Sequence, residues 1–228
     1  FLGILGFLQF DFLTLDCVSG KNSYFNRVYV TQFVPLVLFA VIVMMGGLRA
    51  LVSKFGPAKK RAEALEAIFN QHMYVALLLS YCVFPTVSAV QLKSLWCMTL
   101  EHDGKIIASF LREDSSISCL SPSYQNFRVV VIIGIVVYQG IPLLWFVLLW
   151  RVRHELNPPG QSEKTALLLR DKSPRLEPYK FLFSDYRPSR WAYEVYEMLR
   201  RLFFVGVLPL LGEGAVRAFI GIFLSIWT

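Results

Sequence analysis

The chain has 228 residues, of which 55% are hydrophobic and 15% aromatic, and its mean hydropathy is +0.51. This is more apolar sequence than the core of a soluble domain needs, so the composition predicts a membrane protein with several spans. The formal net charge is +7, but the basic residues lie beside apolar runs rather than on one patch. That distribution is typical of cytoplasmic flanks of spans, so it disfavours nucleic-acid binding and favours attraction to anionic lipids.

The two ends of the sequence are both apolar. Residues 1–16 are too short to cross a hydrocarbon core of about 30 Å alone, so we interpret them as a span end or an interfacial helix. They have neither a basic segment nor a small-residue cleavage site, which disfavours a signal peptide. We expect the chain to be a piece of a longer protein.

Apolar runs separated by charged segments predict an all-α fold, a polytopic transmembrane helical bundle within one domain over residues 1–228. The expected spans cover about residues 28–52, 72–91, 127–150, 196–211 and 215–228. The first two are joined by a basic segment. Residues 57–69 in it read as a short amphipathic helix, which either lies along the membrane or is an ordinary solvated connector.

Polar residues within the second and third spans are candidates for a pore lining or for helix contact. In the second span, interhelical hydrogen bonding explains these residues more simply than a permeation path does. The third span contains Gly140 and Pro142, which predict a kink with a freed carbonyl beside Gln139. The candidates are Ser80, Thr86, Ser88, Gln91, Gln139 and Pro142.

The outer loop, residues 92–126, carries two of the four cysteines, Cys97 and Cys119. Its Asp-Gly pair at 103–104 favours a tight turn, and a short strand can follow it. Outside the cytoplasm, oxidising conditions allow a disulfide between Cys97 and Cys119 that closes the loop. Cys17 is the rival partner for either cysteine, whereas Cys82 lies within a span as a small apolar side chain.

The inner loop, residues 151–187, is polar and reads as irregular with one short amphipathic piece. The chain has no phosphate-binding loop, nucleophile–base pair or metal-ligand cluster, and its three histidines, His72, His102 and His154, are scattered. We therefore expect neither an enzyme nor a cofactor nor a metal.

The stretch 179–211 passes from a basic aromatic segment into an apolar run. Pro188 can open a helix because its missing N–H would be unpaired in the first turn anyway. Glu197 lies four residues before Arg201, so an ion pair at the entry of the span is predicted, with lipid phosphates as the alternative partners of the arginines. The expected interfacial anchor residues are Trp191, Tyr193, Tyr196, Glu197, Arg200 and Arg201, with Glu194 and Arg190 beside them.

The excess of lysine and arginine orients the spans. It predicts that 53–71 and 151–200 face the cytoplasm, while Cys17, 92–127 and 212–214 lie outside. The protein is then integral to the plasma membrane or an organelle membrane.

Several segments, taken in this order, resemble a family of large protist, algal and oomycete membrane proteins that carry cysteine-rich, ephrin-receptor-like repeats. The matching pieces are FDFLTLDC, YCVFPTVSA, LREDSSISCLSPSY, GIPLLWFVLL and FLFSDYRPSRWAYEVYEMLRRLFFVGVLPLL. The resemblance implies a multi-pass domain related to transient-receptor-potential-like channels, with an extracellular ectodomain before Phe1 and further spans after Thr228.

Two functions follow as hypotheses. One is a channel or transport domain lined by polar faces of the spans at 72–91 and 127–150. The other is a non-conducting anchor or receptor base for an adhesive or structural extracellular assembly. The expected partners are membrane lipids, the rest of the same chain, and an oligomer or extracellular assembly.

Overall fold

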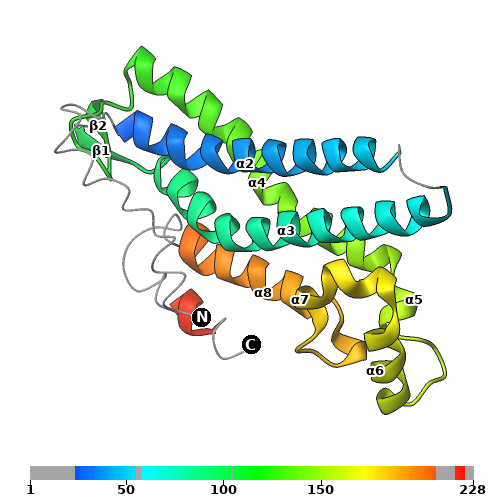
Figure 1. The fold of residues 1–228 in the computed structure, drawn as a ribbon. Coiled ribbons are helices and arrows are strands. Elements are labelled where there is room, and N and C mark those ends of the chain that lie inside the picture. The colour runs from blue at the N-terminus through cyan, green and yellow to red at the C-terminus, as the bar shows by residue number, and fades with distance from the viewer. Residues whose placement is uncertain (1–23, 55–57, 104, 209–218, 224–228) are drawn as a thin grey trace. The chain divides into compact units, whose positions relative to one another are not determined.

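The computed structural model describes residues 24–54, 58–103, 105–208 and 219–223 (Figure 1). Most of them are helical, which confirms the helical part of the predicted fold, and a two-stranded hairpin is the exception. Three helices are long and apolar enough to cross a membrane: α2 (Tyr24–Ser53), α3 (Ala58–Lys93) and α4 (Pro122–Arg151). At 1.5 Å per residue each exceeds the roughly 30 Å of a hydrocarbon core.

The amphipathic helix predicted over residues 57–69 is not a separate element. It forms the first part of α3, which continues without a break to Lys93. The amphipathic stretch and the apolar run that follows it contain no glycine, and the proline inside α3, Pro85, lies well beyond the point where the two stretches meet. Nothing in the sequence therefore interrupts the helix at that point. The basic segment is therefore continuous with the second candidate span.

Each long helix also contains one proline and passes through it. The described residues divide into a first compact unit, within 24–33, 84–140 and 199–223, and a second, within 34–83 and 141–198. Pro35, Pro85 and Pro142 are each the second residue beyond a boundary between these units. A proline removes one hydrogen bond of its helix, so each long helix lacks one such bond close to a boundary between the units.

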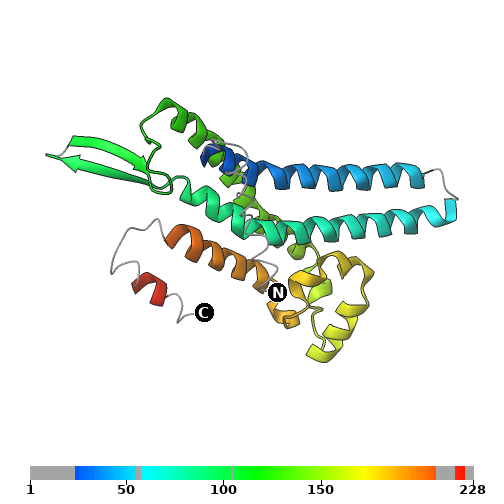
Figure 2. The same cartoon turned by 60° about the vertical axis from the view of Figure 1, so that its left-hand side comes forward.

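The outer loop folds into an antiparallel hairpin of β1 (Cys97–His102) and β2 (Lys105–Leu111), which extends away from the ends of α3 and α4 (Figure 2). Asp103, at the turn, has a φ of +51°, a left-handed conformation that aspartate tolerates better than most residues. The tight turn and the short strand predicted from the Asp-Gly pair are confirmed. Leu100 pairs with Ala108 but Glu101 pairs with Ile106, so Ile107 of β2 is the extra residue of a β-bulge.

The base of the hairpin is held in the core of the first unit. Leu111 and Cys119 are buried there against Val28 of α2 and Phe127 of α4. The rings of Phe25 and Phe127 stack with centroids 4.4 Å apart. These contacts fix where the hairpin leaves the helices.

Residues 151–190 form a series of short helices, not the irregular loop with one amphipathic piece that the sequence predicts. The series begins with α5 (Arg153–Leu156). The next helix, α6 (Glu163–Lys172), is capped by Ser162, whose Oγ accepts a hydrogen bond from the Thr165 N–H at 3.3 Å. It continues with η2 (Pro174–Tyr179), α7 (Lys180–Phe183) and η3 (Pro188–Arg190). Pro188 opens a 3₁₀ turn as expected, but the α-helix that follows begins only at Tyr193.

That helix, α8 (Tyr193–Leu202), continues into a π-helical turn, η4 (Phe203–Val207). A Cβ at Gly206 would lie 2.1 Å from Leu92 Cδ1, so glycine allows this turn to approach α3 closely. Residues 209–218 and 224–228 lie outside the described residues. The spans expected at 196–211 and 215–228 therefore stay predictions.

Candidate functional site

A buried polar network joins α2, α3 and α4 in the first unit. The Gln91 side-chain amide donates to Gln32 Oε1 at 3.1 Å, and the Tyr138 hydroxyl donates to the Gln32 carbonyl at 2.6 Å. Gln32 Nε2 in turn donates to the Val130 carbonyl at 3.3 Å. The Gln32 side chain packs directly on Gly134, because a Cβ added at Gly134 would lie 2.3 Å from Gln32 Cδ. Interhelical hydrogen bonds of this kind contribute about 1 kcal/mol each in membrane proteins, so the network ties the three helices together.

Sequence reasoning singled out Gln91 but missed Gln32 and Tyr138. Gln32 is a lone amide in an otherwise apolar run, and that is the signal by which it could have been found. Tyr138 has no such signal, because a tyrosine in an apolar helix can be a buried hydrogen-bond donor or a ring at the membrane–water interface, and the sequence does not distinguish the two.

Other polar atoms of the first unit are buried and have no hydrogen-bond partner within the described part of the chain. They are Ser88 Oγ, Gln91 Oε1 and both amide atoms of Gln139. A buried polar group without a hydrogen-bond partner lowers the stability of the folded protein by about 1–3 kcal/mol, and both amide atoms of Gln139 lack a partner within the described residues. These groups need a partner beyond the described residues, either water or another helix. Thr86, the remaining candidate in this unit, is half-buried.

In the second unit, Ser80 makes a helix contact. Its hydroxyl donates to the Leu77 carbonyl at 2.6 Å and accepts from Trp145 Nε1 at 3.1 Å. Trp145 is fully buried, and the Tyr81 ring stacks on it with centroids 6.0 Å apart. The Trp145 N–H is thereby satisfied, and α3 and α4 are joined. Pro142 is buried one turn before Trp145.

Arg170 on α6 is a buried charge that sequence reasoning missed. The residue is only 3% exposed, and its guanidinium donates to the backbone carbonyls of Phe183 at 3.3 Å, Tyr186 at 2.9 Å and Ser184 at 3.4 Å. Burial lowers the pKa of Arg170, and the Asp171 carboxylate opposes that shift. Arg170 thus caps the end of α7 and joins α6 to residues 183–186.

Tyr186 and Glu194 form a second polar contact in this segment. The Tyr186 hydroxyl donates to Glu194 Oε2 at 2.6 Å, and Glu194 is buried in the first turn of α8. Burial is the main cause that raises the pKa of Tyr186, and the hydrogen bond to Glu194 adds to it. The phenol therefore stays protonated and keeps donating at neutral pH. Glu194 Oε1 has no partner among the described residues.

The predicted interfacial anchors lie on or just before α8. Tyr193 contacts both Tyr186 and Tyr196, with ring centroids 5.0 Å and 5.7 Å apart. Glu197 is buried and Arg201 is exposed, so their ion pair stays a prediction. Trp191 contacts rings of α4, and Arg200 is half-buried.

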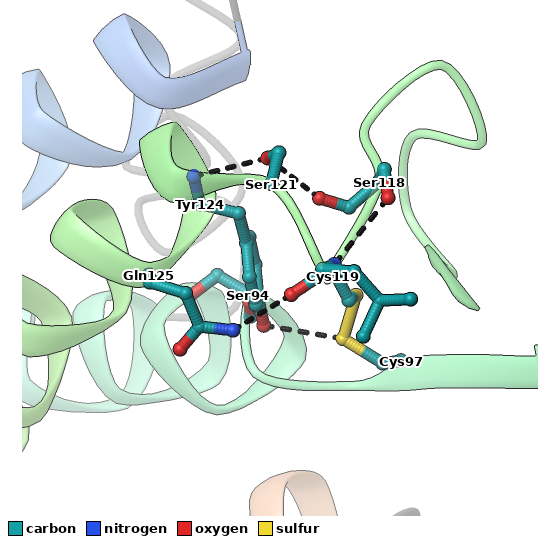
Figure 3. Close-up of a disulfide and its surroundings, with 8 residues drawn as sticks. Ser94, Cys97, Ser118, Cys119, Ser121, Tyr124 and Gln125 are labelled. Carbon is teal, nitrogen blue, oxygen red and sulfur yellow. Dashed lines mark hydrogen bonds between the residues drawn. A yellow bond between two sulfur atoms is a disulfide. The ribbon is translucent and has the colours of Figure 1, made fainter. Parts of the chain in front are cut away.

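The predicted disulfide between Cys97 and Cys119 is confirmed, with the two Cα atoms 6.4 Å apart (Figure 3). The Tyr124 hydroxyl donates to the Ser94 carbonyl at 3.2 Å and lies 3.3 Å from Cys97 Sγ. Gln125 Nε2 donates to the Cys119 carbonyl at 2.8 Å. The first turn of α4 thus holds both cysteines. Cys17, the rival partner, lies outside the described residues, and Cys82 is free and half-buried.

Beside the disulfide is a shallow pocket of about 340 Å³. Leu95, Leu120 and Ile132 line it, and Gln125 and Arg128 are the longer polar side chains at its wall. It is open and mainly apolar.

Comparison with known protein families, with curated proteins and with solved structures finds no match for this chain. Within the described part of the chain, no group of three or more histidine, cysteine, aspartate or glutamate side chains is placed to hold a metal ion.

Proposed function

We propose that this chain is a channel or transport domain of the transient-receptor-potential-like class, in which α2, α3 and α4 cross the plasma membrane or an organelle membrane. It belongs to a larger protein with an extracellular cysteine-rich ectodomain. The family resemblance of the sequence supports this proposal. So does one observation, the buried polar groups that lack a partner.

Gln139 carries that argument. Both of its amide atoms are buried without a partner among the described residues, in the middle of an apolar helix. In hydrocarbon this arrangement is costly, and polar groups at such depth usually face water or another helix. A water-filled path beside α4 would satisfy the amide and let ions or small polar solutes pass.

The alternative is a non-conducting anchor for an extracellular assembly. The network around Gln32 favours it, because that network satisfies polar groups between helices and leaves them unavailable to a solute. The disulfide between Cys97 and Cys119 also favours it, since it gives the outer hairpin a rigid base.

Water accessibility of position 139 distinguishes the two functions. In full-length protein with Cys82→Ala, a Gln139→Cys variant is exposed to a membrane-impermeant thiol reagent. Such reagents attack the thiolate, which forms in water and not in lipid. Val136→Cys is the matched control, because Val136 lies on the same helix and is 70% exposed, as a lipid-facing residue would be.

The proposed path predicts labelling at 139, well above the parent protein, and none at 136. Equal, negligible labelling at both positions would contradict the path and favour another helix as the partner of Gln139. That outcome would support the anchor.

A further inference from the structure

Three aromatic rings form a partly exposed cluster at the end of α4, in the second unit. Phe146 and Trp150 lie on α4, and Trp191 follows η3. Their ring centroids are 5.6 Å apart for Phe146 and Trp150, 5.9 Å for Phe146 and Trp191, and 6.0 Å for Trp150 and Trp191. Phe146 is 39% exposed and Trp150 is 48% exposed, so the cluster presents a surface rather than a core. Trp191 is half-buried, and an exposed tryptophan at the end of an apolar helix, as Trp150 is, is typical of the membrane–water interface.

One arginine packs on this aromatic cluster, and two more are its neighbours in the sequence. Arg153 places its guanidinium carbon 4.4 Å from the centre of the Trp150 ring and donates to the Trp150 carbonyl at 3.0 Å. Arg151 and Arg190 are exposed and adjoin Trp150 and Trp191 in the sequence. The stacking fixes Arg153 while leaving most of its N–H groups free to bind an anion.

The acids of this segment do not neutralise these arginines. Within the described residues, no ion pair involves Arg151, Arg153 or Arg190. Glu155, the next acid along the chain, instead accepts from Arg175 at 2.9 Å and from Ser173 at 3.0 Å. Positive charge therefore accumulates beside the rings without a counter-ion from the described chain.

We propose that this cluster of Phe146, Trp150 and Trp191, with Arg151, Arg153 and Arg190, is a binding site for the phosphate of an anionic lipid headgroup. The rings lie against the upper acyl chain and glycerol region, and the guanidinium groups bind phosphate oxygens, for which their forked geometry is suited. An anionic lipid is favoured over a zwitterionic one because the site carries excess positive charge. The inference requires the chain to be in a membrane but does not depend on whether it conducts.

Photoactivatable lipids test this site in the full-length protein reconstituted in phosphatidylcholine bilayers. The protein is irradiated with limiting photoactivatable phosphatidylserine or, separately, phosphatidylcholine, and the labelled residues are mapped by mass spectrometry. We expect phosphatidylserine to label the peptides that contain residues 146–153 and 190–191 more strongly than phosphatidylcholine does. Arg153→Gln should lower that labelling about fivefold, the equivalent of about 1 kcal/mol for one cation near an anionic lipid.

Arg187→Gln is the matched control. Arg187 is 79% exposed on the same segment and already faces Glu163 at 3.6 Å, so its loss should leave the labelling unchanged. Should Arg153→Gln fail to accumulate, Arg190→Gln provides the same comparison. The proposal is overturned if the two lipids label these peptides equally, or if Arg187→Gln lowers the labelling as much as Arg153→Gln. Displacement of phosphatidylserine by inorganic phosphate would overturn the assignment to a lipid.

Discussion

Replacing Arg170 by methionine should destabilise the short helices of residues 153–190 by about 3 kcal/mol. Arg170 is 3% exposed, and its guanidinium makes three hydrogen bonds to backbone carbonyls, at 2.9, 3.3 and 3.4 Å. A hydrogen bond to a charged group contributes about 1.5–3 kcal/mol net, but the longer bonds contribute less, and the cost of burying the charge offsets part of the sum. Methionine keeps the apolar packing of the side chain and removes every donor, so the loss reports the hydrogen bonds.

The control for Arg170→Met is Arg175→Gln. Arg175 lies five residues further along and pairs with Glu155 at 2.9 Å, but its side chain is 70% exposed. An exposed pair contributes about 0–1 kcal/mol, so this variant should change little. The free energy of local opening is measured by limited proteolysis of residues 151–200 in detergent-solubilised protein. If Arg170→Met were no more susceptible than Arg175→Gln, the capping role of Arg170 would be refuted.

Three further predictions concern the disulfide, the topology and the entry of the span predicted at 196–211. Cys119→Ser should lower the stability of the hairpin by roughly 3 kcal/mol, because it opens a loop that the disulfide closes, and protease resistance measures the loss. Unchanged resistance would contradict this prediction. So would peptide mapping of the unmodified protein that failed to link Cys97 to Cys119. Lys59→Cys should react with an impermeant thiol reagent only from the cytoplasmic side, since the basic flank orients the span, and labelling from outside would reverse the topology. In a double-mutant cycle on surface delivery, Glu197→Gln and Arg201→Gln should show coupling, and effects that simply add would remove the predicted ion pair.

The outer loop could be predicted from sequence because its signals are local. An Asp-Gly pair is sufficient to indicate a tight turn, and two cysteines in one loop limit the choice of partners. The position of Tyr124 against Cys97 could not be predicted in this way. It depends on where the first turn of α4 lies against the end of α3, and no pattern in either segment specifies that contact.

Arg170 shows why the inner segment was harder to predict. An arginine in a short amphipathic helix reads as a solvated charge, and its acceptors are backbone carbonyls 13 to 16 residues away. Every residue has a backbone carbonyl, so the amino-acid type does not indicate which carbonyls accept a hydrogen bond from Arg170. The predicted start of α3 was wrong for a different reason. The change in polarity near residue 70 predicts the end of one element, but a helix can pass from an amphipathic to an apolar stretch without a break, as α3 does.

Current recording from the full-length protein in planar bilayers tests the proposed channel or transport function most directly. A conducting path beside α4 should give discrete unitary currents, and Gln139→Leu should reduce their amplitude because the amide no longer contacts water in the path. Ser80→Ala, which alters a helix contact to Trp145, should leave the amplitude unchanged. Folded, correctly oriented protein that gave electrically silent bilayers, together with absence of solute flux into vesicles, would contradict the account and leave the anchor as the function.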